Sequence, residues 1–315
     1  MFAYIFPGQG SQTVGMGKDL SESSHIARGV FEEVDDALGM DLTKIMFEGP
    51  KETLMLTENA QPAIMAVSVA VSRVIDHQFN IFSQEKPYFA SFLAGHSLGE
   101  YSALVSSGSL ELSDAAKLLR IRGRAMQEAV PLGNGAMAAF LGTEQKKILE
   151  IVNRASEDDV CEVANDNGTG QVVISGNKSA VDRAILLAKA NGVKKSMILP
   201  VSAPFHCKLM ESAAEAMEDA LSSVTLQNPI VPIISNVTAK PENNYKNIKT
   251  LLVKQVTSMV RWRETMEYMI NTGIDSFVEL GCGKVLTGIA KRTKGASIVL
   301  GVDSPNDFEA FGKIL

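Results

Sequence analysis

Residues 95–99 have the sequence Gly-His-Ser-Leu-Gly and stand between an apolar segment, Tyr88 to Ala94, and a helical pattern. The apolar segment predicts a buried strand. Where a strand turns directly into a helix, the central residue is forced into a strained conformation, and side chains at both glycine positions would collide. Chance can produce this pentapeptide, but its position here predicts a nucleophile elbow that exposes the Ser97 hydroxyl at the positive end of the helix.

Strands and helices alternate along much of the chain, as they do in parallel α/β folds. Strands are predicted at Phe2 to Phe6 and at 230–235, 276–279 and 298–302, and a long helix at Gln61 to about His77. The pattern therefore predicts an α/β domain with a parallel sheet. Catalytic residues in such domains follow the carboxyl ends of strands, which is where Ser97 stands.

The middle of the chain has a different order of elements. Strands are predicted at 136–141, 161–164, 171–175 and 193–201, with helices at 143–155 and 179–191 and a connection at Asn165 to Gly168. This β-α-β-β-α-β order is the ferredoxin-like pattern. It predicts a small subdomain at 131–202, inserted into a catalytic domain made of residues 1–130 and 203–315.

The composition excludes several classes of protein. The 315 residues are 45% hydrophobic and 21% charged, as in globular proteins, and the net charge of −6 argues against nucleic-acid binding. Three widely spaced cysteines indicate neither a disulfide framework nor a zinc site, and reduced thiols predict a cytoplasmic protein. The amino terminus lacks the basic start of a signal peptide. The longest apolar segment, 60–75, is shorter than the roughly 20 residues that span a membrane.

A serine hydroxyl needs a neighbouring base, and histidine has a suitable pKa. Of the four histidines, His25 and His77 lie in polar surroundings, and His96 adjoins Ser97, so a structural or contact role is expected for it. His206 follows a predicted strand and precedes a helix, where an α/β sheet places catalytic residues. It is the predicted base, with a satisfied histidine at a domain junction as the alternative. No Asp or Glu stands out as a third member, and a backbone carbonyl could orient the ring instead.

Arg122 is a cation on the apolar face of a predicted helix, 113–129. The apolar positions on this face are Ala115, Leu118, Leu119, Ala125, Met126 and Ala129. A buried guanidinium needs an anion. The anion is either a buried Asp or Glu, or the carboxylate of a substrate, which a guanidinium binds with two hydrogen bonds. The second alternative predicts an acyl group with a free carboxylate, such as malonyl.

Two further polar positions are candidate site residues. Gln255 shares the apolar face of its predicted helix, although such a glutamine is usually a satisfied core amide. Gly8-Gln9-Gly10 follows the first strand, but Thr13 replaces the third glycine of a dinucleotide fingerprint and no Gly-Lys-Ser/Thr follows. We therefore expect this loop to present a backbone N–H to an oxyanion, beside the N–H of Leu98.

Four segments carry a resemblance to a known family: 6–12 (FPGQGSQ), 95–101 (GHSLGEY), 200–206 (PVSAPFH) and 283–286 (GKVL). Together they resemble the malonyl-CoA:acyl-carrier-protein transacylases, stand-alone acyltransferases of type II fatty-acid synthesis. The resemblance covers essentially the whole chain. It implies a hydrolase-like α/β domain with a ferredoxin-like insert, as the periodicity predicts. Cys282 stands where the family often has proline.

The resemblance also implies roles for individual residues. Ser97 would carry the malonyl group, His206 would act as base and then acid, and Arg122 would hold the malonyl carboxylate. The N–H groups of Gln9 and Leu98 would form the oxyanion hole, and the main-chain carbonyl of Gln255 would orient His206. The phosphopantetheine thiol of acyl carrier protein would accept the group in a ping-pong cycle. The enzyme is expected to be a monomer without a permanently bound cofactor, with malonyl-CoA and the carrier protein as substrates.

Alternatives remain at this stage. A serine esterase or thioesterase has the same elbow, but that class usually places its histidine near the end of the chain, and no histidine follows His206 here. An acyltransferase with another acyl-CoA preference, such as methylmalonyl, is a second alternative. A carrier-protein docking module without activity is a third, and the presence of Ser97, His206 and Arg122 argues against it.

Overall fold

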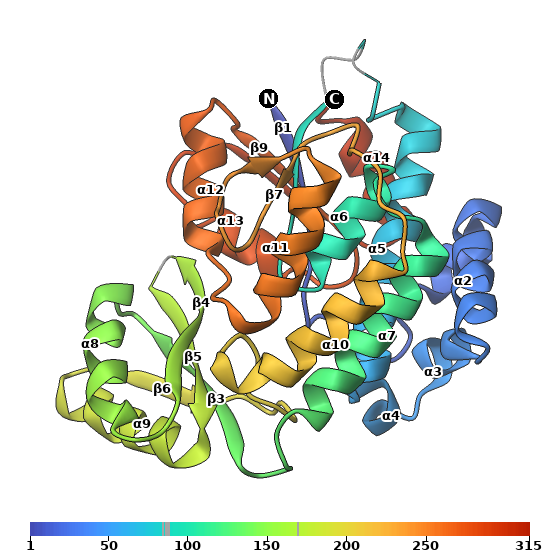
Figure 1. Cartoon of the computed structure of the whole chain (residues 1–315). Helices are drawn as coiled ribbons and strands as arrows, with labels where there is room; N and C mark the ends of the chain where they lie inside the picture. Colours follow the sequence, from blue (N-terminus) through green and yellow to red (C-terminus); the bar gives the residue numbers. More distant parts are fainter. Residues whose placement is uncertain (84, 86–88, 169) are drawn as a thin grey trace.

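Two β-sheets organise the chain in the computed structural model, which describes residues 1–83, 85, 89–168 and 170–315. The larger sheet contains β1 (Phe2–Phe6), β2 (Ala90–Gly95), β7 (Ile233–Ile234), β8 (Pro241–Glu242), β9 (Ser276–Leu280) and β10 (Ile298–Val302). Its strand order is β10-β9-β1-β2-β7-β8, and only β7 and β8 pair antiparallel. The predicted α/β fold class with a parallel sheet is confirmed (Figure 1).

Helices cover both faces of the larger sheet. They are α1 (Lys18–Ser23), α2 (His25–Leu38), α3 (Leu42–Glu48), α4 (Lys51–Met55), α5 (Thr57–Phe79), α6 (Gly99–Ser106), α7 (Leu112–Glu128), α10 (Glu211–Ser222), α11 (Tyr245–Thr257), α12 (Trp262–Asn271), α13 (Val285–Ala290) and α14 (Pro305–Gly312), with a 3₁₀ turn η1 (Lys208–Met210). Tyr4 of β1 faces the core that includes α2, α5 and α7, whereas Ile5 faces α12 and α13. Strands buried on both faces are apolar without alternation, which explains their sequences.

The smaller sheet contains β3 (Gly135–Leu141), β4 (Cys161–Gly168), β5 (Gln171–Asn177) and β6 (Lys195–Ile198). All its neighbours pair antiparallel, in the order β4-β5-β3-β6. With α8 (Gln145–Ser156) and α9 (Lys178–Ala190), the chain order is β-α-β-β-α-β. These elements all lie within the predicted insert, 131–202; its division from the catalytic domain stays a prediction.

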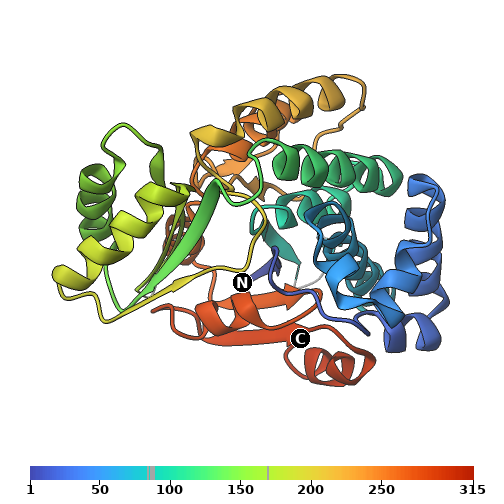
Figure 2. The same cartoon turned by 90° about the horizontal axis from the view of Figure 1, so that it is seen from below.

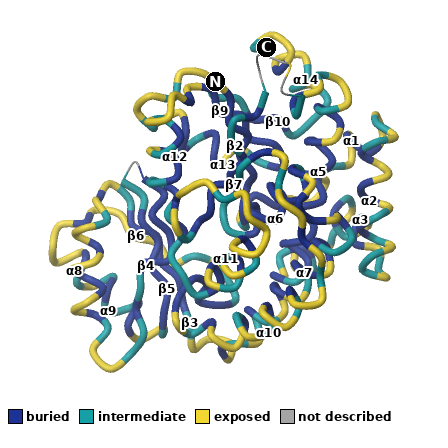
Figure 3. Tube along the Cα trace, turned by 45° about the horizontal axis from the view of Figure 1, so that its top comes forward, coloured by how far each residue is buried: buried dark blue, intermediate teal, exposed yellow. Residues whose placement is uncertain are grey.

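The smaller sheet packs between its own helices and the larger domain (Figure 2). Alternate residues of β3 show this arrangement: Ala138 and Phe140 contact the core of α8 and α9, whereas Met137 and Ala139 belong to the core of the larger domain. Figure 3 shows the largely buried strands β3, β4 and β5 of the smaller sheet and the exposed outer sides of α8 and α9. No helix in the described ranges is long and apolar enough to span a membrane.

One predicted connection is wrong. Asn165 to Gly168 were expected to join two short strands, but they form the second half of β4. The strand continues because Asp166 and Gly168 stand opposite Val172 and Gln171 of β5. On the other side, the N–H of Val260 donates to the carbonyl of Ala164 at 2.8 Å, and the N–H of Asp166 donates to the carbonyl of Val260 at 3.0 Å. These bonds satisfy the backbone of polar residues that would otherwise favour a turn.

Several predicted boundaries also change. The strand predicted at 230–235 is reduced to β7, and the one at 193–201 to β6. The strand predicted from Tyr88 begins at Ala90, and Tyr88 itself lies outside the described residues. The helix predicted from Gln61 begins earlier, at Thr57, and contains Pro62 in its second turn.

Candidate active site

Ser97 lies in the turn between β2 and α6, with a backbone φ of 54° in the left-handed region that side chains disfavour. Both flanking glycines are required for this turn. A Cβ atom on Gly95 would lie 1.9 Å from the carbonyl carbon and oxygen of Gly99, and one on Gly99 would lie 2.4 Å from the oxygen of Phe6. The turn therefore has the geometry that the glycine spacing predicts, and it directs the Ser97 hydroxyl into a cavity.

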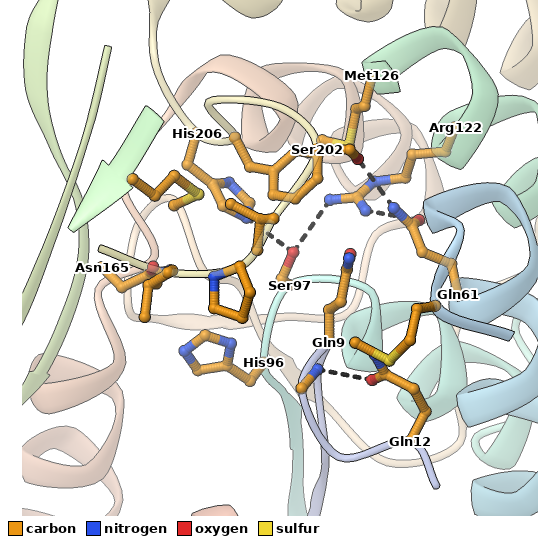
Figure 4. A pocket seen from close by; sticks show the side chains of 17 residues that line it. Gln9, Gln12, Gln61, His96, Ser97, Arg122, Met126, Asn165, Ser202 and His206 are labelled. Atoms are coloured by element: carbon orange, nitrogen blue, oxygen red, sulfur yellow. Dashed lines mark hydrogen bonds between the residues drawn. The ribbon is translucent and has the colours of Figure 1, made fainter. Parts of the chain in front are cut away.

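His206 comes from the loop before η1 and contacts Ser97. The Ser97 hydroxyl donates to His206 Nε2, with 2.7 Å between Oγ and Nε2 (Figure 4). On the other side of the ring, Nδ1–H donates to the carbonyl oxygens of Gln255 at 2.9 Å and Ser258 at 3.2 Å. Because both partners of Nδ1 are acceptors, the proton of the neutral ring is on Nδ1 and Nε2 is free to accept one.

The environment of His206 keeps its ring neutral. The side chain is buried, and burial together with the nearby charge of Arg122 lowers the pKa of His206 to about 3. Two carbonyls orient the ring where a serine protease uses a carboxylate. The arrangement is a serine–histidine dyad, able to take the hydroxyl proton during attack on a carbonyl carbon.

Arg122 is 1% exposed, on the face of α7 that points toward Ser97. Its Nη1 donates to Gln61 Oε1 at 2.7 Å, and its Nη2 donates to Gln255 Oε1 at 2.9 Å and to Ser97 Oγ at 3.2 Å. All three acceptors are neutral, and no described residue forms an ion pair with this guanidinium. Burial lowers the pKa of Arg122, because it removes water from around the charged guanidinium. The geometry leaves a buried cation beside the nucleophile, which favours a carboxylate carried by the acyl group.

A cavity of about 240 Å³ joins these groups. Its lining combines α4, α5, α7 and loops of the larger domain with β3, β4 and the segment after β6, so that it lies between the two sheets. The residues around it are Gln9, Gly10, Gln12, Met55, Gln61, His96, Ser97, Arg122, Met126, Met137, Asn165, Leu199, Pro200, Val201, Ser202, Phe205 and His206. The lining combines apolar side chains with polar groups that converge on Ser97, as in ligand sites generally.

The structure distributes the other predicted site residues around the cavity. Gln9 lines it, and Leu98 follows Ser97 at the start of α6. Their roles in an oxyanion hole stay a prediction. His96 Nε2 lies 2.9 Å from Asn167 Oδ1, and its ring packs against Trp262 with 5.5 Å between centroids. Burial lowers the pKa of His96, so this residue is a neutral contact between the elbow and the small subdomain.

Three residues near the nucleophile were not assigned from the sequence. Asn236 accepts the N–H of Ser97 at 2.8 Å and donates to the carbonyl of Gly95 at 2.7 Å, so it holds both sides of the elbow. Gln61 and Glu100 belong to the same buried network. The signal for Gln61 was an amide within an apolar helix, and for Glu100 a carboxylate within the elbow motif. Asn236 follows a two-residue strand and carries no such signal.

Comparison with known proteins decides the family. The acyl transferase domain matches residues 3–300. The chain belongs to this acyl transferase family. This acyl transferase is 44% identical over 314 residues to the malonyl CoA-acyl carrier protein transacylase of Haemophilus influenzae. The alignment covers 100% of this chain and 99% of the relative.

Solved structures of other acyl transferases have the same fold. An acyl-carrier-protein S-malonyltransferase from Bartonella henselae superimposes with a TM-score of 0.95 at 50% identity, covering 99% of this chain and 98% of that chain. A malonyl-transacylase in complex with its type II PKS acyl-carrier protein has a TM-score of 0.94 at 38% identity, covering 100% and 99%. The acyl transferase activity and the family resemblance predicted from the sequence are confirmed.

Proposed function

We propose that this acyl transferase moves malonyl from coenzyme A to the phosphopantetheine thiol of acyl carrier protein, which supplies the elongation unit of fatty-acid synthesis. The observation that carries the proposal is the Ser97 hydroxyl, which contacts both the base His206 and the cation Arg122 within one cavity. A base activates the hydroxyl, and a cation beside it selects an acyl group that ends in a carboxylate. Malonyl is the smallest common group of this kind.

Loading is the first half of the cycle. Ser97 Oγ attacks the thioester carbonyl of malonyl-CoA while its proton passes to His206 Nε2. The two carbonyls that hold Nδ1–H stabilise the imidazolium that forms. The negative oxygen of the tetrahedral intermediate is held by the N–H groups of Gln9 and Leu98, each contributing about 3 to 4 kcal/mol. Collapse breaks the C–S bond, and His206 returns the proton to the leaving thiolate.

Transfer is the second half. The carrier's thiol enters after coenzyme A has left, His206 takes its proton, and its sulfur attacks the malonyl ester of Ser97. The C–O bond breaks, and the proton returns to Ser97 Oγ. Both half-reactions use the same two residues, so the order is ping-pong, and no permanently bound cofactor takes part.

We propose that the enzyme is a monomer in the cytoplasm. One chain supplies every side chain named in the cycle, so the proposed chemistry requires no second copy. Cys161, Cys207 and Cys282 are free and buried, which supports a reducing cytoplasmic compartment. Light scattering of the purified protein tests the monomer.

Intact-mass measurement tests the proposed reaction. Incubation with malonyl-CoA should add one malonyl group to the wild-type protein and none to Ser97→Ala. Adding phosphopantetheinylated carrier protein should then move that group to the carrier. Loss of the malonyl group to water alone, with the carrier unmodified, would establish a hydrolase in place of a transferase.

Carrier docking can be tested separately. Acyl carrier proteins are acidic, and we propose that exposed Lys194, Lys195, Lys291 and Arg292 attract them despite the net negative charge of the enzyme. Charge reversal at these four positions should raise the KM for the carrier and leave malonyl loading of Ser97 unchanged. An unaltered KM would discard this surface.

A further inference from the structure

Glu100 is a buried carboxyl directly behind the nucleophile that the reaction cycle above does not use. It lies in the first turn of α6 and is 2% exposed. Its Oε2 accepts the backbone N–H of Asn236 at 3.0 Å and the side-chain amide Nε2–H of Gln255 at 2.8 Å. A carboxyl at such depth requires charged or hydrogen-bonding partners, and both partners here also bind the elbow.

The side-chain amide of Gln255 connects Glu100 to Arg122. Its oxygen accepts from Arg122 Nη2 at 2.9 Å, and its nitrogen donates to Glu100 and also to the carbonyl of Ser97 at 3.0 Å. The amide dipole thus lies between a cation at its oxygen end and a carboxyl at its nitrogen end. This orientation is favourable for both charges, whereas a reversed amide would present donors to the guanidinium and an oxygen to the carboxyl.

The other groups around Glu100 do not supply negative charge. The strands β1, β2 and β7 carry no acidic or basic side chain, and α5 contributes the neutral Gln61. Tyr101 on α6 stays neutral because burial raises its pKa to about 12. His206 is neutral as described above. Among the described residues, Glu100 is therefore the carboxyl whose charge acts on Arg122.

We propose that the Glu100 carboxylate balances the charge of Arg122 while the site is empty, and that Glu100 binds a proton when the malonyl carboxylate takes over this role. The inference rests on the proposed function, because it requires a substrate with a carboxylate. Two carboxylates sharing one buried cation repel each other, and protonation of one relieves the repulsion. The substrate carboxylate contacts the guanidinium directly, so Glu100 is the one that gains the proton.

The acidity of Glu100 suits this exchange. Burial raises its pKa to about 7, against the opposing effects of the Asn236 N–H, the Gln255 amide and the Arg122 charge. The malonyl carboxylate adds a negative charge to the site, which raises the pKa of Glu100 further. Malonyl binding just above neutral pH is therefore accompanied by uptake of a proton by Glu100. Glu100 is thus a positioning and selectivity residue that acts through Gln255. The preference for malonyl over acetyl should fall as the pH rises from about 7 to 9.

Proton uptake during loading tests the proposal. The loading reaction releases no net proton near pH 7.5, because the CoA thiol remains mostly protonated there. In weakly buffered solution with a pH indicator, the wild-type protein should take up a substantial fraction of one proton per malonyl-Ser97, counted by intact mass. Acetyl loading should take up none, and Glu100→Gln should take up none with either substrate. Across about pH 7 to 9, the malonyl-to-acetyl ratio of kcat/KM should fall about tenfold in the wild type and stay level in Glu100→Gln.

Glu279 provides a matched control. It is fully buried in β9 and accepts the N–H groups of Leu286 and Thr287 at 3.1 and 2.7 Å, so it contacts α13 and not the cavity. Glu279→Gln changes a buried carboxyl to an amide in the same way. It should keep the proton uptake and the pH-dependent selectivity of the wild type.

The outcomes separate the two proposals. A wild-type protein whose Ser97 stays unmodified would contradict the proposed function. Malonyl-Ser97 formed without proton uptake would overturn the inference alone. Uptake that persists in Glu100→Gln would place the proton on His206 and would also overturn it. If Glu100→Gln does not fold, the wild-type protein still tests the proposal through its proton uptake and its pH-dependent selectivity. A malonyl-to-acetyl ratio of kcat/KM that does not change with pH would refute the proton exchange at Glu100.

Discussion

Replacing Arg122 by alanine gives the most direct measure of how the acyl group is selected. The buried guanidinium can give a malonyl carboxylate two charge-assisted hydrogen bonds, each contributing about 1.5 to 3 kcal/mol. Their loss amounts to about 3 to 6 kcal/mol, or about 10² to 10⁴ in kcat/KM, at 1.4 kcal/mol per factor of ten. Truncation also leaves Gln61 and Gln255 without their donor. That penalty affects every acyl group alike, so it cancels in a ratio.

The assay is therefore a ratio of rates. Rapid-quench acylation of Ser97 by malonyl-CoA and by acetyl-CoA gives the malonyl-to-acetyl preference, which should fall about 10²- to 10⁴-fold in Arg122→Ala. Arg120→Ala is the matched control, because Arg120 lies on the same helix but contacts Glu58 and Asn59 outside the cavity. An Arg122→Ala enzyme that is slower with both substrates but keeps the wild-type preference would refute a carboxylate site at this residue.

Three further predictions concern the elbow, the junction of the sheets and the base. Gly95→Ala should yield no folded protein, as judged by circular dichroism, because the added methyl group overlaps the backbone of the next helix. Arg263→Ala should lower the free energy of unfolding in urea by about 2 to 3 kcal/mol, since it removes the 2.8 Å partner of the buried Asp166 carboxylate. In the Glu100→Gln background, the rate of Ser97 acylation should show no inflection near pH 6.5. The pKa of His206 is lowered to about 3, so the base is already neutral, and activity through this group is lost only as the pH falls toward that value.

Each of these predictions has a contradicting result. A folded and active Gly95→Ala protein would show that the turn tolerates a side chain. Arg124→Ala removes an exposed ion pair with Glu128 and should leave stability almost unchanged. If Arg263→Ala lowered the free energy of unfolding as little as Arg124→Ala does, the ion pair of Arg263 with Asp166 would stabilise the fold no more than a surface pair. A rate inflection at pH 6.5 would mean that the histidine titrates normally.

The sequence predicted those features that have a local signal. The paired glycines predict the turn at Ser97, and a cation in an apolar stripe predicts the buried Arg122. The network behind them is only partly local: Glu100 is a carboxylate next to the elbow motif, whereas Asn236 reaches the elbow only through the fold. Likewise, Asn165 to Gly168 have the local chemistry of a turn, yet they continue β4 because they pair with β5 on one side and bond to Val260, far along the chain, on the other.

Ser97 and His206 both adopt a positive φ, 54° and 59°, although neither is glycine. Each such conformation costs of order 1 to 3 kcal/mol, which the surrounding hydrogen bonds and packing must offset. Glycine would relax the backbone at either position, and at either position it would remove a group that the proposed reaction uses. Substitutions that remove the backbone strain at these two positions would therefore also remove the proposed activity. Any increase in the stability of the protein, by evolution or engineering, has to come from other parts of the fold.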